Sequence, residues 1–236
     1  MRNSFLLKVS GLFVACFITL NVAAQSSRSV NVKSFNNIAV SNGIDLFLTQ
    51  GNTESLVIKG QEDVIKDVVI EQEGNKLTVK YKDGVNWSRL FKGTQIYVYI
   101  TFKKLNSISA SGGSDVETQN TLNTDKMSIR SSGGADLDLS IVCKDITISS
   151  SGGSDVNLKG SAENMVLNTS GGSDVHAFEF KVNYAQVSTS GGSDANIFVN
   201  KGLTASASGG SDISYKGNAA LKKLSNSKSA DITHVN

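Results

Sequence analysis

Hydrophobic and polar residues alternate through the second half of the chain, on both sides of a short phrase that occurs seven times. The phrase is Ser-Gly-Gly-Ser-Asp at 111–115, 151–155, 170–174, 190–194 and 208–212, Ser-Gly-Gly-Ala-Asp at 132–136, and Ser-Lys-Ser-Ala-Asp at 227–231. From Asp115 to Asp231, its aspartates follow one another at intervals of 18 to 21 residues. A repeat of about 20 residues is typical of stacked supersecondary units.

Apolar side chains occupy matching positions in nearly every copy. Seven residues before the aspartates lie Ile108, Ile129, Ile148, Leu167, Val187, Ala205 and Leu224, and one residue after them lie Val116, Leu137, Val156, Val175, Ala195, Ile213 and Ile232. Alternation around a Gly-Gly turn predicts two short strands and a corner in each copy. Because one copy cannot bury its own apolar face, we predict an all-β fold, a parallel β-helix or β-solenoid of about 20-residue coils. We expect it to be right-handed, as parallel crossovers are.

The corner carries two rows of polar side chains that the alternation directs outward. Serines occur four residues before the aspartates, at Ser111, Ser132, Ser151, Ser170, Ser190, Ser208 and Ser227. The aspartates are Asp115, Asp136, Asp155, Asp174, Asp194, Asp212 and Asp231. Carboxylates about 4.8 Å apart repel one another by roughly 1 kcal/mol per pair even in bulk water. We therefore expect each carboxylate to accept hydrogen bonds from the amides of its own Gly-Gly corner.

The preceding segment has a different pattern. Strands are predicted at Ile38–Leu48, Leu56–Lys59, Lys76–Tyr81 and Gln95–Phe102, with a short helix at Gln61–Val69. We interpret 25–110 as a β-rich head that continues the solenoid and covers its first coil, because a solenoid must hide its terminal core. The chain then divides into 1–24, the head at 25–110, and the solenoid repeats at 111–236.

Residues 1–24 have the pattern of a secretory signal peptide. Arg2 and Lys8 precede an apolar run, and Val22-Ala23-Ala24 forms a small-residue cleavage site. The run is too short to span a membrane, so no membrane span is expected after cleavage. Cleavage removes two of the 23 basic residues, which leaves 21 basic and 21 acidic side chains. This balance argues against nucleic-acid binding. We expect an exported protein in the periplasm, associated with the outer membrane, or outside the cell.

A resemblance to a known family rests on two motifs. They are Ser-Asn-Gly-Ile-Asp-Leu-Phe-Leu-Thr-Gln-Gly at 41–51 and the later Ser-Gly-Gly-Ser-Asp copies. Together they resemble the putative auto-transporter adhesin family with a head GIN domain, a group of secreted bacterial proteins. The resemblance covers essentially the whole mature chain. It implies a β-helix-like fold and export, in an organism of the Bacteroidota type, and it brings no catalytic residues with it.

The sequence contains no catalytic motif, and a uniform row of aspartates offers no carboxylate pair with distinct environments for acid and base roles. We therefore predict a non-catalytic, adhesin-like protein that needs no cofactor. Its serine and aspartate rows would face a glycan or a cell-surface protein. Two alternatives remain open: a polysaccharide-cleaving β-helix enzyme, and an envelope scaffold that assembles with itself. Calcium binding along the aspartates is a further alternative, because hard cations favour carboxylate oxygens.

Overall fold

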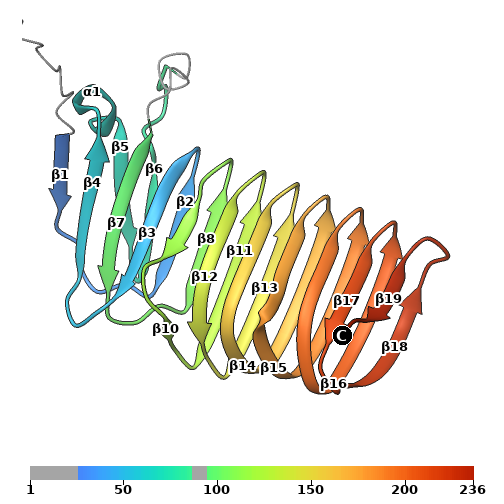
Figure 1. Cartoon of the computed structure of the whole chain (residues 1–236). Coiled ribbons are helices and arrows are strands. Elements are labelled where there is room, and N and C mark those ends of the chain that lie inside the picture. The colour runs from blue at the N-terminus through green and yellow to red at the C-terminus, as the bar shows by residue number, and fades with distance from the viewer. Residues whose placement is uncertain (1–25, 87–94) are drawn as a thin grey trace, which may run out of the picture.

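The computed structural model describes residues 26–86 and 95–236, and in these residues the chain forms a β-solenoid (Figure 1). The proposed signal peptide at 1–24 lies outside the described residues. The coils are flattened, so each has two faces that meet at a sharp bend. The bends line up along one edge of the molecule, at the top of Figure 1.

The first face consists of strands that begin at the bends and run away from them, together with the strands of the head. In spatial order they are β1 (Ser26–Val30), β4 (Ser55–Gly60), β7 (Ile96–Phe102), β3 (Ile44–Gln50), β9 (Val116–Thr118), β12 (Asp136–Val142), the first parts of β14 (Asp155–Gly171), β15 (Asp174–Gly191) and β16 (Asp194–Gly209), β17 (Asp212–Lys216) and β19 (Asp231–His234). The short β10 (Leu122–Asn123) pairs with the end of β12.

The second face consists of strands that run toward the bends, except β5, which runs in the opposite direction. Its order is β5 (Val68–Glu73), β6 (Lys76–Tyr81), β2 (Asn37–Ser41), β8 (Ser107–Ser111), β11 (Lys126–Ser132), β13 (Asp145–Ser151), the second parts of β14, β15 and β16, and β18 (Ala220–Asn226). The pairings are parallel except where β5 meets β6. On the first face, β4 is antiparallel to both β1 and β7.

The apolar columns predicted from the repeat lie above one another in the structure. Ile129 pairs with Ile148, Ile148 with Leu167, and Leu167 with Val187. Each of these side chains is at most 1 % exposed, and all belong to one core that runs the length of the solenoid. Burying a side chain of this size stabilises the fold by roughly 1.5–3 kcal/mol. The stacked core therefore holds the coils together.

The last coil departs from the predicted alignment. Leu221, rather than Lys222, pairs with Leu203, and the register then shifts by one residue between Ala205 and Ser206. Leu224, which the repeat placed in an inward column, is 58 % exposed. A bulge in β18 explains the difference, because Leu224 is the extra residue, which is paired neither with Ala205 nor with Ser206 and so is not held in the inward column.

The strands of the head pair directly with those of the solenoid. The chain forms one coil from β2 and β3, leaves it through β4, the helix α1 (Glu62–Ile65) and β5, and returns through β6 and β7. These two strands pair with one side of the first coil, and β8 and β9 pair with the other. The predicted strand over Ile38–Leu48 is therefore two strands with a bend between them. The helix is shorter than expected because Val68 and Val69 already belong to β5.

Candidate functional site

Glycines form the bends and stack directly on one another. Gly133 and Gly152 have positive φ angles of 63° and 70°, a backbone conformation that residues with a Cβ rarely adopt. A Cβ atom placed on Gly152 would lie 3.2 Å from the amide nitrogen of Gly133, and one on Gly171 would lie 3.1 Å from that of Gly152. The bends thus combine a left-handed conformation with close backbone packing, and both requirements favour glycine.

The predicted serine and aspartate rows run along this edge, and together we call them the corner row. Successive strands pair Ser111, Ser132, Ser151, Ser170, Ser190 and Ser208 in register. The strands that follow the bends pair Asp136, Asp155 and Asp174 in one run, and Asp194, Asp212 and Asp231 in another. The remaining aspartate, Asp115, directly precedes Val116, which pairs with Leu137.

The aspartates bond differently from the sequence-based prediction. Oδ1 of Asp174 accepts a hydrogen bond from the backbone N–H of Asp194 at 3.0 Å. Asp194 and Asp212 accept in the same way from the coil that follows each, at 3.1 Å and 3.0 Å. The expectation that each carboxylate caps its own corner is therefore wrong for these residues. Each of these carboxylates is hydrogen-bonded to the backbone of the next coil. This hydrogen bond offsets part of the repulsion between the carboxylates of the row.

A buried serine closes the corner in place of the aspartate. Ser154, Ser173, Ser193 and Ser211 precede the aspartates, are fully buried, and donate to the carbonyl oxygens of the outer serines three residues earlier at 2.8–3.0 Å. Their hydroxyls also form hydrogen bonds with small polar residues on the inner side of the strands. One example joins Thr169 Oγ1 and Ser193 Oγ, which are 2.9 Å apart. This inner row was not predicted from the sequence, although a Ser or Ala before every aspartate was its signal.

The corner row also has a member that lies outside the seven copies of the repeated phrase. Ser41 pairs with Ser111, and the backbone N–H of Asn42 donates to the carbonyl oxygen of Ser111. Asn42 and Gly43 both have a φ of 72°, so the bend at 42–43 matches the glycine bends. Residues 41–45 are thus a further copy of the phrase, with Ser and Asp in the same places. The repeat period does not indicate this copy, because the rest of the head lies between Asp45 and Asp115, which are 70 residues apart.

At this end of the row the carboxylates have distinct environments. The carboxylate of Asp45 accepts a hydrogen bond from the backbone N–H of Asp115. Burial and, to a smaller extent, the Asp115 charge raise the pKa of Asp45 to about 6. Asp115 is exposed as a residue, yet loss of solvent around its carboxyl group, with Asp136 and Asp138 nearby, raises its pKa as well. The expectation of a uniform row is therefore wrong here.

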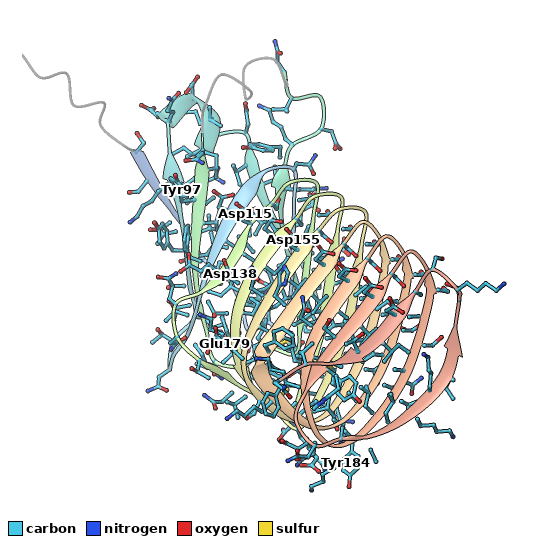
Figure 2. All side chains as sticks on the ribbon, turned by 45° about the vertical axis from the view of Figure 1, so that its right-hand side comes forward. Tyr97, Asp115, Asp138, Asp155, Glu179 and Tyr184 are labelled. Carbon is cyan, nitrogen blue, oxygen red and sulfur yellow. The ribbon has the colours of Figure 1, made fainter. Side chains whose placement is uncertain are left out.

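These aspartates border a shallow groove of about 260 Å³ on the first face. We call it the acidic groove; its lining residues are Asp45, Leu46, Phe47, Asp115, Val116, Glu117, Asp136 and Asp138. In Figure 2, Asp115 and Asp138 lie on the face of the solenoid that also carries Tyr97. Every titratable side chain lining the groove is acidic, so the groove is suited to a ligand that carries positive charge or donates hydrogen bonds.

Two further observations concern metals and membranes. Within 26–86 and 95–236, no three His, Cys, Asp or Glu residues are grouped so that they could hold a metal ion. Over the same residues, the fold contains no helix with the length and apolar character needed to cross a bilayer.

Comparison with solved structures identifies the fold. A putative adhesin from Bacteroides fragilis is 28% identical to this chain, with a TM-score of 0.82 over 90% of this chain and 97% of that one. Two structures from Parabacteroides distasonis show the same fold. One, described as a putative lipid binding protein, is 16% identical (TM-score 0.73; 90% and 97% covered), and the other, a putative adhesin, is 20% identical (TM-score 0.72; 91% and 98% covered).

No curated protein matches the chain. A family model does match, over residues 34–219, and it carries the description putative auto-transporter adhesin, head GIN domain. The match includes the 41–45 bend and six of the seven later copies of the repeated phrase, and it covers most of the solenoid. The chain therefore belongs to the putative auto-transporter adhesin family with a head GIN domain.

Proposed function

We propose that this protein is an exported, adhesin-like protein that binds a glycan or a cell-surface partner through the corner row and performs no chemistry on it. The family and the adhesin-named structures support a binding role in general terms. The observation that carries the specific proposal is the repetition of one serine–aspartate pair along a single straight edge, held in register by backbone pairing.

A periodic edge suits a periodic ligand. Coils about 4.8 Å apart present a hydroxyl and a carboxylate at each step, so an extended polymer can contact several coils at once. Each contact is weak on an exposed surface, but linked contacts raise the overall affinity well above that of one contact. We therefore expect the affinity to rise steeply with the length of the ligand.

The test replaces the pairs in the middle of the row. A variant with Ser151→Ala, Ser170→Ala, Asp155→Asn and Asp174→Asn keeps the acceptor oxygens of both aspartates, and we expect it to lose most attachment to a glycan array. The matched control changes outward side chains further from the corner, Thr147→Ala, Gln186→Ala and Glu179→Gln, all of them exposed. Equal attachment by the two variants would show that the corner row is not the contact surface.

Glycan cleavage is a second candidate, and one observation favours it. Asp45 is half-buried, with its pKa raised to about 6, and lies beside the exposed Asp115, so the two carboxyl groups have the distinct environments that acid and base roles require. Incubating the protein with polysaccharides and measuring new reducing ends distinguishes the two functions. Binding without product supports the adhesin-like role, whereas product that disappears in Asp45→Asn supports an enzyme.

Self-assembly is a third candidate, supported by the last coil. Leu221 and Leu224 are 39 % and 58 % exposed there, and β18 and β19 end the two faces of the solenoid. Light scattering across a range of concentrations tests it, because end-to-end stacking makes the mass rise with concentration. Repeating the measurement in millimolar calcium and in EDTA also tests whether the aspartates bind calcium.

Export remains part of the proposal. The pattern at 1–24 supports it, and so does membership in a family described as auto-transporter adhesins. Mass spectrometry of the secreted or envelope fraction should find a chain that begins at Gln25. A cytosolic chain that retains residues 1–24 would contradict export.

A further inference from the structure

Aromatic side chains form a stack beside the acidic groove. The rings of Phe47 on β3 and Tyr99 on β7 stack with centroids 4.9 Å apart and planes 17° apart. The Nζ atom of Lys59 lies 4.4 Å from the centroid of the Tyr99 ring. Strand β3 lies between β7 and β9, and it pairs Phe47 with Tyr99 on one side and with Glu117 on the other. One face of the Phe47 ring therefore packs on Tyr99, and the opposite face is directed toward β9.

The direction of that second face places it in the acidic groove, which Phe47 and Glu117 both line. A neighbouring groove of about 330 Å³ shares Glu117 and Asp138 with it. This second groove adds the hydroxyl and amide groups of Thr118, Ser140 and Asn157. It also contains the ammonium group of Lys159, which lies 3.6 Å from a carboxylate oxygen of Glu179. The two grooves thus form one depression on the first face, acidic and aromatic at the head and lined by hydroxyls, an amide and one lysine further along.

The two ends of the depression favour different parts of one ligand. A cationic amine beside an aromatic ring face and several carboxylates gains a cation–π interaction and charge-assisted hydrogen bonds. Hydroxyl groups of a ligand can exchange hydrogen bonds with Thr118, Ser140 and Asn157. Carbon-bound hydrogens on the ligand can cover the apolar ring of Phe47.

We infer that this depression binds a saccharide that carries free amino groups, that is, an oligomer of a deacetylated hexosamine. The inference rests on the proposed function in taking the ligand to be a glycan. It assigns a site on the first face that shares only Asp45, Asp115 and Asp136 with the corner row. Charge complementarity decides the chemistry, because the titratable side chains lining the acidic groove are all carboxylates. A bound ammonium group also offsets the repulsion between Asp45 and Asp115.

The shape supports a chain lying across the face. Each groove is near or below the lower end of the range of about 300–1,000 Å³ in which pockets enclose a whole ligand. Both are shallow, and they join at Glu117 and Asp138. A linear oligomer of a few sugar units fits such a depression, with an amino group near Phe47 and hydroxyl groups near Asn157.

The experiment is calorimetric titration of the protein with a glucosamine tetrasaccharide and, separately, with its fully N-acetylated counterpart. We expect the amino form to bind, the acetylated form to bind at least tenfold more weakly, and added salt to reduce the affinity of the amino form. Phe47→Leu keeps an apolar residue and removes the ring, and it should weaken binding about 3- to 30-fold. Phe198→Leu is the matched control, because Phe198 is a half-buried aromatic on the same face near the other end of the solenoid.

The outcomes separate this site from the corner row. The inference stands if the amino tetrasaccharide binds, Phe47→Leu weakens that binding and the quadruple corner variant leaves it unchanged. This result does not depend on whether the corner row binds a ligand of its own. Equal binding of the acetylated form would overturn the role of the amino group. No loss in Phe47→Leu, or tighter binding of a tetralysine peptide than of the sugar, would overturn the site or its saccharide ligand. Thermal unfolding of each variant shows that the fold is kept.

Discussion

The Asp45 carboxyl group provides a test of the electrostatics at the head of the corner row. Burial and the Asp115 charge raise its pKa from 3.8 to about 6 in the folded protein. Because the folded state then holds the proton more tightly than the unfolded state, ionised Asp45 destabilises the fold. The cost is absent below about pH 3.8, grows as the pH rises toward 6, and is complete above pH 6.

The magnitude follows from the size of the shift. A difference of about 2.2 pKa units corresponds to about 3 kcal/mol at 1.36 kcal/mol per unit. Asp45 is only half-buried, so solvent screening reduces this, and we take about 1.5 kcal/mol as the expected cost. Asp45→Asn removes the charge and keeps an oxygen that can accept from the backbone N–H of Asp115. It should therefore stabilise the protein by about 1.5 kcal/mol at pH 7.5 and by almost nothing at pH 4.

Urea unfolding at the two pH values measures this difference, with the variant and the unaltered protein compared at each pH. Asp212→Asn is the matched control, because Asp212 accepts the same kind of bond from Asp231 but is exposed. Its gain at pH 7.5 should be much smaller. Equal gains for Asp45→Asn at pH 4 and pH 7.5, or a loss at pH 7.5, would refute the reasoning.

Three further substitutions or reactions test the packing. Gly160→Ala should lower the free energy of unfolding by at least about 3 kcal/mol in urea, because the φ of Gly160 is +118° and a Cβ there would lie 2.0 Å from the carbonyl oxygen of Ile141. Gly153 has free space around it, so Gly153→Ala should lower it by only about 1–2 kcal/mol. Equal losses would contradict the close approach at Gly160. Ser154→Ala should cost about 1–2 kcal/mol through its lost buried hydrogen bonds, and a change within error would show that the inner row contributes nothing. The Cys143 thiol, whose pKa is raised to about 11 by burial and Asp145, should react with iodoacetamide at pH 8 about 100-fold more slowly than in urea-unfolded protein, as followed by mass spectrometry.

The sequence predicted the solenoid because its coils share a period. Apolar residues at fixed distances from each aspartate indicated the stacked columns, and pairs such as Ile148 with Leu167 confirm them. The prediction failed where one coil departs from the period. At β18 a bulge shifts the register by one residue, and a bulge leaves no mark in a pattern of alternating residue types.

The site was predictable in outline only. Spacing alone places the outer serines and aspartates on one edge, but it does not say which amide each carboxylate reaches. The bond from Asp194 to Asp174 joins two coils, and it depends on the offset between neighbouring strands. The acidic groove was missed for a different reason, since Asp45 and Asp115 become neighbours only because the head leaves the first coil and returns beside it.

The central structural claim is that residues 41–45 form the coil adjacent to 111–115. Cysteine crosslinking tests it directly, in a Cys143→Ser background. Ser41→Cys with Ser111→Cys should form a disulfide under mild oxidation, because paired residues on neighbouring strands lie about 4.8 Å apart, within the usual Cα–Cα range of about 4.4–6.8 Å. Ser41→Cys with Ser132→Cys should stay reduced, because those residues are two coils apart. Failure of the first pair to crosslink, or equal crosslinking of both, would contradict the stacking of the head coil on the repeats.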